Sequence, residues 1–241
     1  MSEAGKNKIF PGIWPAIGWL VAFILLQLVA GVAALMVAIA TDGAGRNPTA
    51  IAADLTSFAV PMIWSLVVSE LLLLALLWLY LRKPGRSAAL GLDRWSKLPL
   101  WRTLGLAVLL IGAGLGFNYL YSEYVVPDIK MQEELRKLFA AIPQTLPNTI
   151  LLFAAVAVIA PLIEELLFRG LLQRSLSNKL PVWAAITISA LAFGAVHMDF
   201  YALPVLVAMG VAFGILYHVT GSLRVTILLH MVNNAAALML S

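Results

Sequence analysis

Long apolar runs separated by short polar segments dominate the chain and predict a bundle of membrane-crossing helices. The first run, residues 14–40, contains no charged side chain. It is longer than the roughly 20 residues that a helix needs to cross a bilayer. The apolar runs together give seven candidate spans: residues 14–40, 57–81, 103–121, 149–172, 182–197, 201–217 and 225–240. We therefore predict an all-α, polytopic transmembrane helical bundle with seven spans, or eight if one segment is re-entrant.

The composition supports the same environment. Hydrophobic residues make up 62% of the 241 residues and charged residues only 12%, whereas about a quarter of an ordinary soluble domain is charged. No stretch between the apolar runs is long enough for a separate soluble domain, so residues 1–241 are predicted to form a single membrane domain. The chain has no cysteine, which excludes disulfides, thiolate catalysis and cysteine-ligated zinc or iron–sulfur sites.

Basic residues predict the orientation of the bundle. The loop at residues 82–102 carries six Lys or Arg and one acid, Asp93. Placing this loop in the cytoplasm puts most other basic residues outside the spans on the same side: Lys6, Lys8, Arg174, Lys179 and Arg224. We therefore expect an integral membrane protein with a cytoplasmic N-terminus. The net charge of +4 is then an orientation signal that can also contact anionic lipid heads, and no nucleic-acid partner is expected.

Residues 122–147 form the one long connection on the opposite side. Apolar side chains alternate with charged ones there at helical spacing, at Ile129, Met131, Leu135, Leu138 and Phe139. This pattern predicts a short amphipathic helix on the membrane surface. A solvated connector with an apolar underside is the preferred interpretation, and a substrate gate is the alternative.

Two glycine pairs with four-residue spacing predict places where helices pack closely. They are Gly112 with Gly116 and Gly210 with Gly214, each within an apolar run. Because glycine has no side chain, such pairs let two helix backbones approach each other in a membrane.

Ionisable side chains within the spans are few, and each is a candidate for function. Placing one at membrane depth costs at least about 2.5–3.5 kcal/mol on insertion scales. The set is Glu70, Glu164, Glu165, Arg169, His197 and His230, with Asn118, Asn233 and Asn234 as amide companions. A Glu–Arg pair or a lone buried histidine is by itself more often structural. Glu70 has no basic residue near it in the sequence, and a protonated or interface-facing acid is the preferred interpretation.

The segment APLIEELLFRGLLQ, residues 160–173, gives its two adjacent glutamates different environments. At about 100° per residue, Glu165 and Arg169 lie one helical turn apart on one face, while Glu164 points about 100° away from Glu165. Glu165 can therefore pair with Arg169. This pairing leaves Glu164 available as a general base.

Two further helices each carry a histidine with a companion one turn away. Phe193 precedes His197, and Asn234 follows His230. A carboxylate base, two imidazoles and a carboxamide are sufficient to activate a water molecule and to stabilise the oxyanion that forms when it attacks a carbonyl. The pattern therefore predicts hydrolysis of an acyl bond.

These three motifs together resemble the signatures of a known family. The motifs are E-E-x-x-x-R at Glu164, Glu165 and Arg169, F-x-x-x-H at Phe193 and His197, and H-x-x-x-N at His230 and Asn234. In this order they resemble the CPBP family of CAAX prenyl proteases and bacteriocin-processing enzymes, also called the ABI family of intramembrane glutamic endopeptidases. The resemblance covers about residues 148–240, and residues 1–147 resemble the family only as apolar spans with a connector.

The resemblance implies roles for the motif residues. Glu164 and His197 would activate the water, and His230 and Asn234 would stabilise the oxyanion. The supporting residues would be Glu165 and Arg169, which hold the helix, and Phe193, which lines the cavity.

The resemblance also implies a substrate and a location. The eukaryotic branch of the family removes the last three residues of prenylated CAAX proteins, whereas bacterial-type members act on peptides or membrane proteins. The expected substrate is therefore a peptide or membrane protein, prenylated or not. The expected location is the bilayer of a bacterial or archaeal cell.

Other interpretations remain open. No cofactor is expected, although two histidines and a glutamate could bind zinc with a water in the open position. The metal-free mechanism is preferred because these ligands come from three helices and form no H-E-x-x-H motif. A non-catalytic partner, in bacteriocin immunity or sensor-kinase regulation, is the main alternative class. A proton-coupled transporter is less favoured, because the polar residues cluster on the last four spans.

Straight helices would conflict with shared catalysis by Glu164 and His197. At 1.5 Å per residue, these side chains would lie roughly 15–20 Å apart along the membrane normal. We therefore predict that the helix carrying Glu164 extends beyond the inner surface, or that residues 197–204 bend within the membrane.

Overall fold

All regular structure in the described part of the chain is helical. The computed structural model describes residues 10–41, 47, 54–127 and 133–240. Five helices are long and apolar enough to cross a membrane: α1 (Ile13–Thr41), α3 (Leu55–Leu81), α5 (Leu100–Tyr124), a continuous helix Leu146–Ser177, and α11 (Leu203–Thr220). Two apolar helices are shorter, α10 (Val182–Ala195) and α12 (Leu223–Leu240). The prediction of an all-α polytopic bundle is confirmed.

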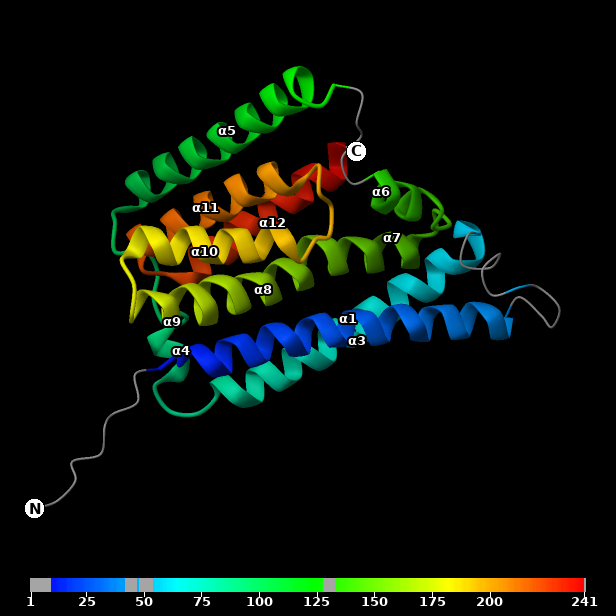
Figure 1. The fold of residues 1–241 in the computed structure, drawn as a ribbon, viewed down its shortest axis with the longest axis horizontal. Helices are drawn as coiled ribbons and strands as arrows, with labels where there is room; N and C mark the ends of the chain where they lie inside the picture. Colours follow the sequence, from blue (N-terminus) through cyan, green and yellow to red (C-terminus); the bar gives the residue numbers. More distant parts are fainter. Residues whose placement is uncertain (1–9, 42–46, 48–53, 128–132, 241) are drawn as a thin grey trace, which may run out of the picture.

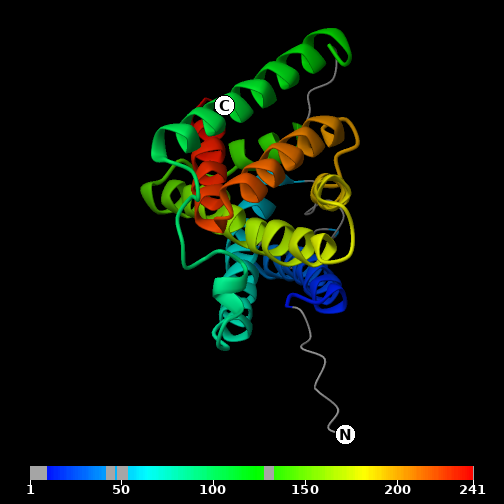
Figure 2. The ribbon, with the colours of Figure 1, turned by 90° about the vertical axis from the view of Figure 1, so that its left-hand side faces the viewer.

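The helices are arranged around the long helix Leu146–Ser177 (Figure 1). The antiparallel pair α1 and α3 lies on one side of it, and α10, α11 and α12 lie on the other (Figures 1 and 2). Helix α5 is outermost and packs against α11. The long helix therefore contacts both halves of the bundle, and its central residues face elements from each.

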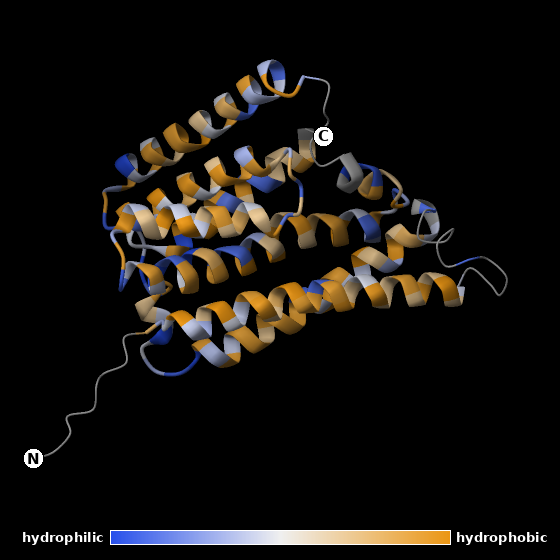
Figure 3. Ribbon diagram, viewed as in Figure 1, coloured by the Kyte–Doolittle hydropathy of each residue, from blue (hydrophilic) through white to orange (hydrophobic). Residues whose placement is uncertain are grey.

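Most residues of the helices are hydrophobic, and hydrophilic residues concentrate at helix ends and on the inner helices (Figure 3). On α1, large side chains such as Leu28, Val32 and Met36 are exposed, whereas Ala30 and Ala34 are buried. Large apolar groups facing outward in this number fit a lipid environment and not water. The small alanines allow α1 and α3 to pack closely.

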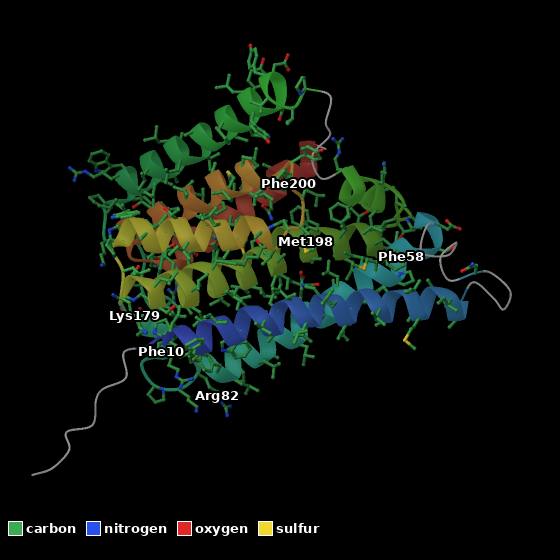
Figure 4. All side chains as sticks on the ribbon, in the orientation of Figure 1. Phe10, Phe58, Arg82, Lys179, Met198 and Phe200 are labelled. Carbon is green, nitrogen blue, oxygen red and sulfur yellow. The ribbon has the colours of Figure 1, made fainter. Side chains whose placement is uncertain are left out.

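The loop after α3 holds the ends of α11 and α12. It contains the short helix α4 (Arg86–Ala89). The Tyr217 hydroxyl donates a hydrogen bond to the Leu90 carbonyl, and the Ser222 hydroxyl donates one to the Arg94 carbonyl. Arg82 and Lys179 lie at this same end of the bundle, opposite Phe58 (Figure 4). This clustering of basic residues agrees with the predicted grouping, while the cytoplasmic orientation stays a prediction.

The predicted amphipathic helix is present as α6 (Glu133–Ala140). Leu138 and Phe139 pack against the apolar cluster that contains Ala59, Ile63 and Ile142. The underside of the connector is thus fixed to α3. Ile129, Met131, Lys6 and Lys8, which were part of the sequence predictions, lie outside the described residues.

One of the two glycine pairs packs as predicted and the other does not. A Cβ atom on Gly210 would lie 2.9 Å from the Cα of Ala190, and one on Gly214 would lie 2.9 Å from Ile186, so both glycines pack against α10. A Cβ atom on Gly112 or Gly116 would have no neighbouring atom within 4 Å. The prediction was wrong for this pair, since the glycine that packs closely on α5 is Gly114, against Met209.

We predict that Gly210→Ala lowers the thermal unfolding temperature of the purified protein in detergent. The new methyl group would push against the backbone of Ala190, and overpacking of this kind costs about 1–3 kcal/mol. Gly112→Ala is the matched control, because it has open space and gains helix propensity. Equal unfolding temperatures for the two variants would contradict the packing described here.

Candidate active site

The two adjacent glutamates lie where the long helix changes its winding. This helix consists of α7 (Leu146–Phe153), the π-helical segment η1 (Ala154–Ile159), α8 (Ala160–Glu164), the π-helical segment η2 (Glu165–Gln173) and α9 (Arg174–Ser177). Glu164 therefore ends α8 and Glu165 begins η2. The wider π-turns are rare and are found most often at functional sites.

Pro161 explains how Asn234 attaches to this helix. In a π-turn the carbonyl of Val156 would accept a hydrogen bond from the residue five positions later, but that residue is Pro161, which has no N–H. The Val156 carbonyl instead accepts a hydrogen bond from Asn234 Nδ2 at 3.1 Å. Asn233 Nδ2 donates to Asn234 Oδ1 at 3.3 Å, which orients the amide. The Asn234 amide keeps a second N–H.

The predicted pairing of Glu165 with Arg169 is confirmed. Arg169 Nη1 lies 2.9 Å from Glu165 Oε1, and both side chains are buried. Arg169 Nη2 also donates to the carbonyl of Gly210 on α11 at 3.1 Å. The guanidinium lies 4.5 Å from the ring centre of Phe193 and 5.3 Å from that of Phe213. One buried cation thus joins the long helix to α10 and α11.

His230 contacts both glutamates. Its Nδ1 lies 2.9 Å from Glu165 Oε1 and its Nε2 lies 3.5 Å from Glu164 Oε2. Because an ionised carboxylate accepts hydrogen bonds and does not donate them, we assign the Nδ1 proton to the contact with Glu165. The ring of Phe213 stacks on the imidazole with centres 4.5 Å apart. The imidazole is therefore fixed with Nε2 directed at Glu164.

His197 approaches Glu164 from a different helix end. Its Nδ1 lies 2.8 Å from the carbonyl oxygen of Phe193, which can only accept a hydrogen bond, so Nδ1 carries the proton. Its Nε2 lies 3.8 Å from Glu164 Oε1. Both histidines thus present Nε2 to the same carboxylate.

Two structural features accompany the short distance between Glu164 and His197, and the depth of each in the membrane stays a prediction. The helix carrying Glu164 has 32 residues, more than the roughly 20 that cross a bilayer. Helix α10 ends at Ala195, and residues 196–202 form a turn before α11. Met198 has a φ of 55° in this turn. The carboxylate of Asp199 accepts hydrogen bonds from the backbone N–H groups of Tyr201 and Ala202 and so orders the turn that precedes α11.

Exposure separates the site into two groups. The side chains of Glu164 and His197 are 13% and 25% exposed, whereas those of Glu165, Arg169 and His230 are at most 4% exposed. Glu164 and His197 are therefore the groups that a water molecule or substrate can reach. Glu165, Arg169 and His230 are buried and contact one another behind Glu164 and His197.

Phe193 lies at the centre of the aromatic packing around these groups. Its ring contacts Phe168, His197 and His230 edge-on, with ring centres 5.0–5.9 Å apart. Phe213, which stacks on His230, and Gln173, which donates to the Gly214 carbonyl at 3.0 Å, were not identified from the sequence. One sequence signal could have identified Gln173. It follows Arg169 by four residues, and Gly214 follows Gly210 by four residues, so the two side chains can donate to the two glycine carbonyls in the same way.

Metal binding has no direct support in the described part of the chain. No group of three or more His, Asp or Glu side chains there is arranged to hold a metal ion. The first candidates for metal ligands would be Glu164, His197 and His230, because the two imidazole rings lie close to the Glu164 carboxylate. The zinc alternative stays a prediction that needs its own experiment.

Comparisons with known proteins agree with the motifs. Residues 146–236 match the family model of the Type II CAAX prenyl endopeptidase Rce1-like proteins. "Putative membrane peptidase YdiL" of Bacillus subtilis (strain 168) is 28% identical over 198 residues, 79% of this chain and 75% of the relative. "Membrane-embedded CAAX protease MroQ" of Staphylococcus aureus (strain USA300) is 38% identical over 85 residues, 33% of this chain and 34% of the relative. No solved structure matches the chain.

The match of residues 146–236 to the Rce1-like CAAX endopeptidase model confirms the resemblance carried by the three motifs. This segment contains every motif residue from Glu164 to Asn234. With the apolar helices described above, the matches support a membrane-embedded peptidase at family level.

We predict that Arg169→Met lowers the free energy of unfolding by about 3–5 kcal/mol, because it leaves Glu165 as a buried charge without its partner. Glu165→Gln combined with Arg169→Met should cost less than the sum of the two single changes. Unfolding in detergent, followed by circular dichroism, measures both.

The control is Arg94→Met. Arg94 and Asp93 form a pair of similar length, 3.0 Å, in which both side chains are about half exposed. Exposed pairs contribute about 1 kcal/mol or less. If Arg169→Met and Arg94→Met destabilise the protein equally, the buried pair is not the structural clamp described here.

Proposed function

We propose that this chain is an endopeptidase that cleaves peptide bonds of membrane-associated peptides or proteins with a water molecule activated by Glu164 and His197. The observation that supports the proposal best is the convergence of two imidazole Nε2 atoms on one partly exposed carboxylate, at 3.8 Å and 3.5 Å. Neither Nε2 carries a proton in the neutral tautomers assigned above. Water held there would meet only groups that can accept its protons.

Glu164 acts as the general base in this mechanism. It accepts a proton from the water while the water oxygen attacks the carbonyl carbon of the scissile peptide bond. The same proton then moves to the departing amide nitrogen, so the carboxylate is restored when the two peptide products form. His197 orients the water through Nε2, and its own orientation is fixed by the Phe193 carbonyl.

His230 and Asn234 are proposed to stabilise the oxyanion of the tetrahedral intermediate. To donate from Nε2, His230 has to take up a second proton beyond the neutral tautomer assigned above, while Nδ1 continues to donate to Glu165. Asn234 would donate the N–H that is not used by the Val156 carbonyl. Glu165 and Arg169 support the two helices that carry these donors.

The proposed substrate class follows from the surroundings of the site. The reactive groups lie on apolar helices that face lipid, so the substrate is a peptide or protein that is itself associated with the membrane. "Membrane-embedded CAAX protease MroQ" is named for such an activity. The proposed substrates include both prenylated and unprenylated peptides. We also propose that the protein lies in a bacterial or archaeal membrane with its N-terminus in the cytoplasm.

The first prediction concerns the base. Glu164→Gln should lower kcat for peptide cleavage by at least about 100-fold, because general-base catalysis contributes about that much or more. A panel of prenylated and unprenylated membrane peptides, with products identified by mass spectrometry, provides the measurement. Glu165→Gln removes the same charge from the neighbouring residue and is the variant with which Glu164→Gln is compared.

Cleavage that survives Glu164→Gln in a correctly folded protein would refute the role of Glu164 as base. If the wild-type chain cleaves no peptide in the panel, the balance shifts to the non-catalytic membrane partner, in bacteriocin immunity or sensor-kinase regulation.

The second prediction concerns metal dependence. Incubation with a strong chelator such as EDTA or 1,10-phenanthroline, followed by its removal, should leave the cleavage rate unchanged, because the proposed mechanism needs only the side chains named here. Loss of activity that returns on addition of Zn²⁺ would overturn the metal-free mechanism. A zinc-dependent peptidase of known sensitivity, treated in parallel, controls for effective chelation.

A further inference from the structure

Glu70 is a buried ionisable side chain that the proposed mechanism does not use. It lies in the middle of α3 and is 3% exposed. Its Oε2 has no hydrogen-bond partner among the described residues. A charged carboxylate there would be uncompensated at membrane depth, so the side chain is the neutral acid, whose hydroxyl needs an acceptor. Burial within the bundle also excludes the interface-facing interpretation of this residue.

The packing of α3 places Glu70 beside α8. On the turn before it, Val67 belongs to the same apolar cluster as Ile159. On the turn after it, Leu74 and Leu162 line the same cavity of about 310 Å³. The two helices run in the same direction (Figure 1), so the residue between Val67 and Leu74 lies at the level of the segment between Ile159 and Leu162.

Glu164 is the acidic residue at the end of α8, the helix that contacts α3 beside Glu70. The basic side chain that follows it on the long helix, Arg169, is engaged by Glu165 and Gly210. Two neighbouring carboxyl groups in a low dielectric are stable when one of them keeps its proton.

We infer that Glu70 is a positioning residue for the base: as a neutral acid it donates a hydrogen bond to the Glu164 carboxylate, directly or through one water molecule. This contact holds Glu164 toward the two histidines. The Glu70 hydroxyl thereby has an acceptor, and Glu164 has a hydrogen-bond donor on α3 in addition to the two histidines. The inference rests on the proposed function, since it assigns Glu70 to the same site.

Kinetics of four variants test the inference. Glu70→Gln keeps a donor and should retain kcat within about threefold, whereas Glu70→Leu should lose about tenfold or more in kcat with little change in KM, a difference of the size expected for a charge-assisted hydrogen bond. Ser69→Ala is the matched control, because the Ser69 hydroxyl bonds only within its own helix, to the Leu66 carbonyl at 2.8 Å. Glu70→Met replaces Glu70→Leu if that variant fails to fold.

A purely structural role makes the opposite prediction. Replacing a buried polar group that has no partner by an apolar one of similar size is neutral or stabilising, so Glu70→Leu would then match Ser69→Ala in kcat and in unfolding temperature. That result, or loss of kcat in folded Glu70→Gln, would overturn the inference. If these variants match the control while Glu164→Gln is inactive, the inference fails and the proposed function stands.

Infrared spectroscopy tests the inference without a substrate. At neutral pH, the wild-type spectrum should contain the C=O stretch of a protonated carboxyl that is absent from Glu70→Gln. This band should shift in Glu164→Gln, because its acceptor changes from a carboxylate to an amide. Absence of the band, or a band that is insensitive to Glu164→Gln, would overturn the inference even if the wild-type protein cleaves peptides.

Discussion

The buried contact between Glu165 and Arg169 is the interaction on which the rest of the site depends. Both charges lie where neither water nor lipid heads can solvate them, so each requires the other together with further partners. Arg169 finds these in the Gly210 carbonyl and two aromatic rings, and Glu165 finds one in His230. These requirements fix four helices relative to one another: the long helix, α10, α11 and α12. The orientation of Glu164 follows, because it is the residue directly before Glu165 on the same helix.

The π-helical winding of the long helix provides a second attachment, in addition to the contact between Glu165 and Arg169. A regular α-helix would use the Val156 carbonyl internally, whereas Pro161 and the π-helical segment leave it for Asn234. The same helix therefore has two attachments to α12, one at each end of α8, through Asn234 and through His230. Helix α12 is held at its start by the loop after α3. Glu164, His230 and Asn234 are thus positioned on helices, while His197 lies in the turn directly after α10.

The sequence predicted the helical class, the approximate spans and the pairing of Glu165 with Arg169, because hydrophobic runs and helical spacing are local properties. It also predicted that the helix carrying Glu164 extends beyond the inner surface or that residues 197–204 bend within the membrane. The helix has 32 residues and residues 196–202 form a turn, while their depth in the membrane stays a prediction. The sequence could not place Phe213 or the carbonyl partners of Arg169, since these depend on which face of α11 meets the long helix. The packing at Gly114 was missed for the same reason, and the sequence left open whether Glu70 is a protonated acid within the bundle or faces the interface.

Helix α10 has 14 residues, which corresponds to a length of about 21 Å. The hydrocarbon core of a typical bilayer is about 30 Å thick. A bilayer can adjust to this mismatch by becoming thinner beside the turn at residues 196–202, and the polar backbone of that turn can also be hydrated. Both adjustments bring the aqueous phase close to His197 from one side of the membrane. In the proposed mechanism, this is the side from which water reaches Glu164.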